Sequence, residues 1–199
     1  DANIHSYQIE GRYLVTSTEY QIKRLEVGGF DRLYTLTQNF RRSDGEGRFR
    51  NQEFTMLEWA RVGESLGAIE RDAEALTLAA HHALGGEGII SYGGHRIDLD
   101  LPWDRLSVRE AIERYAGATL PDFSLASIRN AALHAELGMQ ASWENDAPLL
   151  FSLLMDHIQP SLGTSKPVFI GDWPAFETSS AAEKTGDTAE RSELFIAGV

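Results

Sequence analysis

FRRSDGEGRFRNQEFTMLEW, residues 40–59, crowds four arginines into ten positions around a glycine-rich turn. The flanking segments, RLYTLTQNFRR (32–42) and NQEFTMLEWARVG (51–63), are rich in β-branched and aromatic residues. Such segments on both sides of a glycine-rich turn predict two strands. We therefore expect an antiparallel hairpin with a long loop at the centre of the fold.

Alternation along a strand assigns the side chains of this hairpin to faces. Two sets each share one face of their strand: Thr35, Thr37, Asn39 and Arg41 in the first strand, and Phe54, Met56, Glu58 and Ala60 in the second. A polar face carrying Arg41 beside a face carrying Phe54 and Glu58 is suited to form a pocket floor.

The chemistry of these side chains indicates the kind of ligand. An arginine fork matches phosphate or carboxylate oxygens, and a phenylalanine can stack on a base, with a contribution of roughly 1–3 kcal/mol. A carboxylate among apolar neighbours requires a cationic partner. Phosphate, base and ammonium together suggest a nucleotide and an amino acid. The pattern alone also fits solvated arginines near a loop, with Glu58 facing water at a sheet edge.

Composition limits the class of protein. The 199 residues suffice for one sizeable core or a large piece of a bigger domain, and no apolar run reaches the length of a membrane span. The absence of cysteine excludes disulfides, thiolate zinc sites and cysteine nucleophiles, and it fits the cytoplasm. A net charge of −12 argues against broad nonspecific binding to nucleic acid.

The rest of the chain predicts an α+β fold. Residues 13–29 predict a short strand, a cap at Ser17 or Thr18, and a helix that Gly28 and Gly29 end. Further helices are expected at 66–84, 107–116, 124–137 (closed by Gly138) and 148–158, a small hairpin at 88–102, and strands at 166–174 and 192–199 around a polar loop at 177–191. The prediction is one unit on an antiparallel sheet, with a helical insertion between its strands. The chain opens without an obvious element and ends inside a strand, so we expect it to be part of a longer domain.

The opening stretch resembles motif 2 of class II aminoacyl-tRNA synthetases of the lysyl and aspartyl subgroup. That motif runs F-R-x-E, a variable loop, and R-H/R-x-x-E-F-T-M-x-E. Upstream, YLVTSTEYQIKRLEVGG (13–29) is similar to the segment that these enzymes write as L-x-T-S-P-E-Y-x-x-K-R-L, followed by a glycine pair. Downstream, KPVFIGDWPA (166–175) and AERSELFIAGV (189–199) resemble their later strands.

Within the subgroup, TSTEYQIKRL and EFTMLEWAR are most similar to the short lysyl-tRNA synthetase paralogs that lysylate elongation factor P. The resemblance implies a class II antiparallel-sheet catalytic domain over residues 1–199, with a helical insertion at about 66–163, that is usually a homodimer. It also implies activation of a lysine-like amino acid with ATP and Mg²⁺, and transfer to tRNA or to a protein such as elongation factor P.

The resemblance assigns roles position by position. Arg41 would hold the α-phosphate and the attacked carboxylate and would stabilise charge in the transition state. Arg50 stands near the γ-phosphate, and Phe54 stacks on adenine. Glu19 and Glu58 would bind the α-ammonium of the substrate. At the other end of the chain, Glu193 matches the first of two magnesium-binding glutamates. These assignments and strand alternation predict that Arg41, Phe54 and Glu58 face one cleft.

Three positions depart from the pattern: Ser43 replaces the glutamate of F-R-x-E, Ser192 replaces the phenylalanine of R-F-E, and Ala60 replaces an aromatic residue that helps close the lysine side-chain pocket. The loop is one residue longer, so Asp44 or Glu46 could replace the missing carboxylate. Motif 1 is absent, and the sequence stops before the second magnesium glutamate and motif 3. The departures leave a second function open, a non-catalytic paralog that binds nucleotide or amino acid and regulates or scaffolds a partner.

Overall fold

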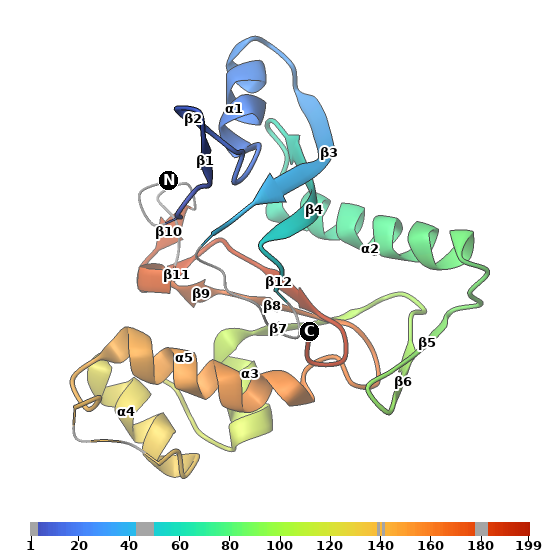
Figure 1. Cartoon of the computed structure of the whole chain (residues 1–199). Helices are drawn as coiled ribbons and strands as arrows, with labels where there is room; N and C mark the ends of the chain where they lie inside the picture. The colour runs from blue at the N-terminus through green and yellow to red at the C-terminus, as the bar shows by residue number, and fades with distance from the viewer. Residues whose placement is uncertain (1–3, 43–49, 139, 141, 178–182) are drawn as a thin grey trace. The chain divides into compact units, whose positions relative to one another are not determined.

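The computed structural model describes residues 4–42, 50–138, 140, 142–177 and 183–199 (Figure 1). These residues form two compact units, Asp1–Ser65 and Leu66–Val199. Ser43, Asp44, Glu46 and Arg48 lie outside the described residues. Within the described part of the chain, none of the helices combines the length and the apolarity needed to cross a membrane.

The first unit is built around a long hairpin. Its elements are β1 (Gln8–Ile9), β2 (Arg12–Tyr13), α1 (Glu19–Val27), β3 (Arg32–Phe40) and β4 (Glu53–Arg61). Strands β3 and β4 pair antiparallel from Arg32↔Arg61 to Phe40↔Glu53 without a break in register. The predicted hairpin is therefore confirmed. Helix α1 packs beside β3 and buries Ile22, and it ends at Gly28 as predicted.

The second unit holds the larger core. Its helices are α2 (Leu66–Ala83), α3 (Val108–Ala116), α4 (Leu125–His134) and α5 (Ala147–Ile158), with the 3₁₀ turns η1 (Gln159–Ser161) and η2 (Ala175–Glu177). Its strands are β5 (Ile89–Tyr92), β6 (His95–Asp98), β7 (Asp104–Ser107), β8 (Val168–Gly171), β9 (Trp173–Pro174), β10 (Lys184–Thr185), β11 (Thr188–Ala189) and β12 (Glu193–Phe195). Along this unit a run of strands (β5–β7) is followed by a run of helices (α3–α5) and then by a second run of strands (β8–β12), an order that supports the predicted α+β class.

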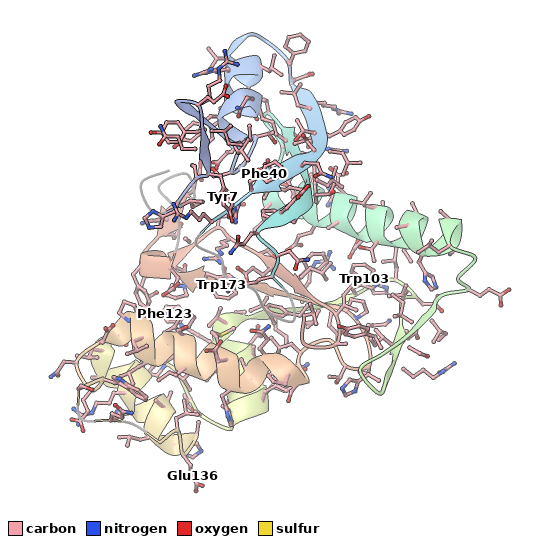
Figure 2. The ribbon with its side chains drawn as sticks, in the orientation of Figure 1. Tyr7, Phe40, Trp103, Phe123, Glu136 and Trp173 are labelled. Carbon is pink, nitrogen blue, oxygen red and sulfur yellow. The ribbon has the colours of Figure 1, made fainter. Side chains whose placement is uncertain are left out.

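Strand β8 lies at the centre of this unit because its sequence VFIG is apolar on both faces. It pairs with β12 on one side and β7 on the other. Helices α3 and α5 cover one face of this sheet, and α4 packs on α5 (Figure 1). In that core, Phe123 and Trp173 both make edge-to-face contacts with Phe151, at centroid distances of 5.9 and 6.0 Å. Phe123 and Trp173 are labelled in Figure 2.

The other face of the β7–β8–β12 sheet packs against α2. Phe169 of β8 and Trp103 are buried in a smaller cluster, to which α2 contributes Ala73 and Leu78. Arg105 on β7 lies 5.1 Å from the centroid of the Phe169 ring. Its Nη2 donates to Glu74 at 2.8 Å and its Nε to Glu70 at 3.0 Å, so Arg105 attaches α2 to the sheet.

Two predictions about this unit were wrong in detail. Helix α4 ends at His134, and Glu136 rather than Gly138 has a left-handed backbone conformation after it, with φ 54°. Strands β7 and β8 pair parallel, whereas the other strand pairs of the described residues are antiparallel. A short charged strand such as β7 forms because the buried β8 offers its edge, not because of its own sequence.

Candidate functional site

The β3–β4 register brings the predicted site residues onto one face of the hairpin. Thr35 lies opposite Glu58, Thr37 opposite Met56, and Asn39 opposite Phe54. Paired residues of antiparallel strands point to the same side of the sheet. The two sets of side chains found by alternation therefore form one continuous surface. Asn39 is buried there, and its Nδ2 donates to the carbonyl of Thr37 at 3.0 Å.

Glu58 is the most strongly hydrogen-bonded side chain of this surface. Its Oε1 accepts from the hydroxyl of Ser17 at 2.9 Å, and its Oε2 accepts from the backbone N–H of Thr18 at 2.8 Å. The Thr18 hydroxyl contacts the same Oε2 and lies 2.7 Å from the hydroxyl of Thr35. The loop before α1 thus holds the carboxylate by donors to both oxygens.

These contacts determine the charge state of Glu58. Partial burial by itself raises the pKa of this carboxyl, but the hydrogen bonds from Thr18 and Ser17 and the charge of Arg41 outweigh it and lower the pKa below the ordinary 4.5. Glu58 is therefore an anion at neutral pH. An ionised, half-buried carboxylate is suited to bind a cationic group such as an ammonium.

Arg41 and Phe54 lie together as predicted. The Nε of Arg41 donates to the carbonyl of Thr16 at 3.0 Å, and the guanidinium carbon lies 5.3 Å from the centroid of the Phe54 ring. The backbone N–H of Arg41 also donates to the carbonyl of Gln52 at 2.9 Å, which extends the hairpin ladder. One face of the hairpin thus presents a guanidinium, an aromatic ring and, four pairs further along the ladder, the Glu58 carboxylate.

The remaining predicted residues of the first unit have simpler surroundings. Glu19 begins α1, and its carboxylate accepts from Lys23 at 2.5 Å on the helix surface. Arg50 is exposed and precedes β4 by three residues. Ala60 lies opposite Leu33 and is half-buried, so the position predicted to border the amino-acid pocket carries no polar group.

Glu193, the predicted magnesium ligand, belongs to the second unit. It lies on β12, and its Oε1 accepts from Arg191, whose guanidinium also lies 4.5 Å from the centroid of the Trp173 ring. In the described part of the chain, no three His, Cys, Asp or Glu side chains form a metal-binding group. A single carboxylate still fits Mg²⁺, which often takes one or two protein carboxylates and completes its shell with substrate phosphates and water.

The second unit also contains a cavity of about 530 Å³ that sequence reasoning missed. Its lining mixes charged and apolar groups, including Glu70, Arg105, Phe169, Glu190 and Arg191. The lining comes from α2, β7, β8 and the segment before β12. The first and last of these segments lie more than 100 residues apart in the sequence. No local motif could have indicated this cavity.

Sequence reasoning also missed the groups that hold Glu58. Ser17 and Thr18 were identified only as caps of α1, and Thr35 only as a strand residue. One sequence signal was present, because a Ser-Thr pair before a helix offers more donors and acceptors than a single cap needs.

Comparison with known proteins adds evidence from the whole chain. Residues 2–199 match the family model described as tRNA synthetases class II (D, K and N). The chain is 34% identical to a lysine–tRNA ligase of Methanoculleus marisnigri, over 94% of this chain and 37% of that protein. It is 32% identical to an elongation factor P–(R)-β-lysine ligase of Yersinia enterocolitica, over 94% of this chain and 53% of that protein. The chain thus spans about half or less of the length of these relatives.

Proposed function

The chain belongs to the class II tRNA synthetases of the D, K and N type, and from this premise we propose that the protein activates a lysine-like amino acid with ATP. The product of this step is an aminoacyl-adenylate. The observation that carries the proposal is the ionised Glu58, held through both oxygens on the same hairpin face as the Arg41–Phe54 pair. A cation site and an anion site on one surface fit a substrate that presents an ammonium and a carboxylate to ATP.

The proposed reaction needs no general base. The carboxylate of the amino acid attacks the α-phosphorus of ATP, the bond to the bridging oxygen of pyrophosphate breaks, and pyrophosphate leaves with its electron pair. Arg41 would bind the α-phosphate and the attacking carboxylate and stabilise the charge that builds on the phosphoryl oxygens. Phe54 would stack on adenine, and Glu58 would hold the α-ammonium so that the carboxylate points at phosphorus.

The family pattern gives roles to three further residues. Glu19 would be a second carboxylate for the ammonium, and Arg50 would contact the γ-phosphate. Glu193 would be a ligand of Mg²⁺, which when bound neutralises phosphate charge and orients the leaving pyrophosphate. These roles rest on the family pattern, because in the structure Glu19 is paired with Lys23 and Glu193 with Arg191.

The acceptor and the assembly are also part of the proposal. Relatives named as tRNA ligases and as elongation factor P ligases support transfer of the activated amino acid to tRNA or to a protein. The net charge of −12 favours a protein acceptor, because tRNA binding depends on phosphate neutralisation. We include in the proposal a homodimer and an insertion over residues 66–163 of one catalytic domain.

A second candidate function is a non-catalytic paralog that binds nucleotide or amino acid and regulates or scaffolds a partner. Ala60 is the observation that favours it, because this position of the hairpin face has no group able to read an amino-acid side chain. Retention of Arg41, Phe54 and Glu58 on one face weighs against it.

Pyrophosphate exchange on the full-length protein separates the two functions. The assay measures ATP formed from labelled pyrophosphate with each of the standard amino acids and with β-lysine. Exchange that depends on a basic amino acid is the expected result, and an Arg41→Ala variant that removes it is the control. Binding of ATP without exchange for any amino acid would support the non-catalytic paralog.

A further inference from the structure

The loop before α1 uses its polar groups in an unusual way. Thr18 is the N-cap residue of α1, and an N-cap threonine commonly accepts a hydrogen bond from the first turn of its helix. Here the Thr18 side chain makes no such bond. Its hydroxyl is directed to Glu58 of β4 instead, 40 residues away in the sequence. The Thr18 side chain therefore does not cap the helix and instead donates to the Glu58 carboxylate.

The direction of each hydrogen bond follows from the chemistry of its partners. An ionised carboxylate can only accept, so the Thr18 hydroxyl must donate its single proton to Glu58. The Thr18 oxygen can then only accept from Thr35, whose hydroxyl lies 2.7 Å away. The protons therefore point along one chain, from Thr35 through Thr18 to Glu58. Thr35 is the cross-strand partner of Glu58, so the hairpin register fixes both ends of this chain.

The other carboxylate oxygen is held separately. Ser17 donates to Oε1 at 2.9 Å while its oxygen accepts from the backbone N–H of Glu19 at 3.1 Å. Ser17 thus replaces part of the missing cap of α1. Ser17 bonds Oε1, and Thr18 bonds Oε2 with two donors, its N–H and its hydroxyl.

We propose that Thr18 is a positioning residue, which fixes the orientation of the Glu58 carboxylate for the ammonium group of the amino-acid substrate. This inference rests on the proposed function, because it takes Glu58 as the group that binds that ammonium. With Oε2 held by two donors from Thr18 and Oε1 by one from Ser17, the carboxylate cannot rotate, and one acceptor position on Oε1 remains for the ammonium. In the pattern that the segment resembles, this position is a proline, which could supply neither donor.

The test uses four forms of the full-length protein: wild type, Thr18→Val, Thr18→Ser and Thr55→Val. Thr18→Val removes only the hydroxyl, Thr18→Ser keeps it, and Thr55→Val makes the same change at an exposed site on the opposite face of the hairpin. Pyrophosphate exchange gives KM separately for lysine and for ATP. A second measurement follows the Glu58 carboxyl by ¹³C NMR in protein labelled at glutamate, with Glu58→Gln to assign the signal.

The expected result is a rise in KM for lysine in Thr18→Val of roughly tenfold to a hundredfold, the range for loss of a hydrogen bond to a charged group. KM for ATP should change little, and Thr18→Ser and Thr55→Val should both resemble wild type. An unchanged KM for lysine in Thr18→Val, or an equal rise in both KM values, overturns the proposal.

The NMR measurement separates this inference from the proposed function. Wild type that activates no amino acid would refute the proposed function by itself. The Glu58 titration then decides the positioning role: a pKa that rises in Thr18→Val but not in Thr18→Ser supports it, and an unchanged pKa overturns it.

Discussion

Replacing Arg105 with methionine should loosen α2 from the sheet of the second unit. Arg105 donates to Glu74 at 2.8 Å and to Glu70 at 3.0 Å, and its guanidinium lies over Phe169. The Glu74 side chain is only 10% exposed, whereas Arg105 is 43% exposed. Methionine keeps the aliphatic packing of the stem but leaves Glu74 with a buried charge and without this cationic partner.

The size of the stability loss in Arg105→Met follows from the different burial of the two partners, Arg105 and Glu74. Breaking a fully buried ion pair by removing one partner destabilises a protein by roughly 3–5 kcal/mol, and exposed pairs contribute about 0–1 kcal/mol. One carboxylate here is nearly buried and the guanidinium is half in solvent, so a loss of about 2–3 kcal/mol is expected. Because each 1.4 kcal/mol is a tenfold change in an equilibrium, the amides of α2 should exchange roughly 30-fold to 150-fold faster.

Hydrogen exchange measured by mass spectrometry on peptides from α2 tests this estimate directly. Arg129→Met is the matched control, because Arg129 donates to Glu144 at the same 2.8 Å with both side chains about 40% exposed. Its local effect should stay below about 1 kcal/mol. The double variant Arg105→Met/Glu74→Leu should recover much of the protection, since it removes the buried charge as well as its partner. An effect of Arg105→Met on α2 no larger than that of Arg129→Met on α4 would refute the reasoning.

Three further predictions concern the hairpin face. Phe54→Ala should raise KM for ATP, because base stacking worth roughly 1–3 kcal/mol is lost. Arg41→Ala should abolish adenylate formation, because it removes a bidentate contact that strengthens in the transition state. Pyrophosphate exchange distinguishes the two variants, and small, equal effects of both would contradict the ATP pocket. Ala60→Tyr should shift the substrate preference towards α-lysine, because it restores a group that can hydrogen-bond an ε-ammonium. Competition between lysine and β-lysine in the same assay measures this preference, and no shift would mean that Ala60 is a neutral replacement. Because folding lowers the pKa of Glu58, its ionised form stabilises the fold above pH 4.5, and this contribution is lost as the pH falls through the lower folded value. In acid unfolding, the stability of Glu58→Gln should therefore fall less steeply with decreasing pH than that of wild type.

The local elements were largely predictable because each carries its own signals. The β3–β4 hairpin follows from alternation around a turn, and α3 begins at a Ser107–Glu110 capping box and ends at Gly117, whose φ of 67° suits glycine. Strand β7 was not predictable, since its state depends on a parallel pairing of Asp104 with Val168, 64 residues later. Strands β10 and β11 were likewise hidden in a segment that reads as a polar loop.

The candidate site divides in the same way. Alternation was enough to place Phe54 and Glu58 on one face, and the register confirms it. The donors to Glu58 come from residues about 40 positions earlier, so only the folded chain reveals that Ser17 and Thr18 serve the carboxylate. The assignment of Glu193 as a metal ligand stays a prediction, as do the roles of Glu19 and Arg50.

Because the pairing of β3 with β4 is unbroken, the position of a residue within its strand decides on which face of the hairpin its side chain lies. Nine consecutive pairs fix Thr35 opposite Glu58 whatever the number of residues that connect Arg41 to Gln52. Added residues in the connection should therefore leave this pairing in place, at a loop-closure cost that grows only slowly with length. Deleting a single residue inside either strand would turn every later side chain of that strand to the opposite face. The face on which Glu58 lies therefore depends on the spacing within each strand, not on the length of the connection.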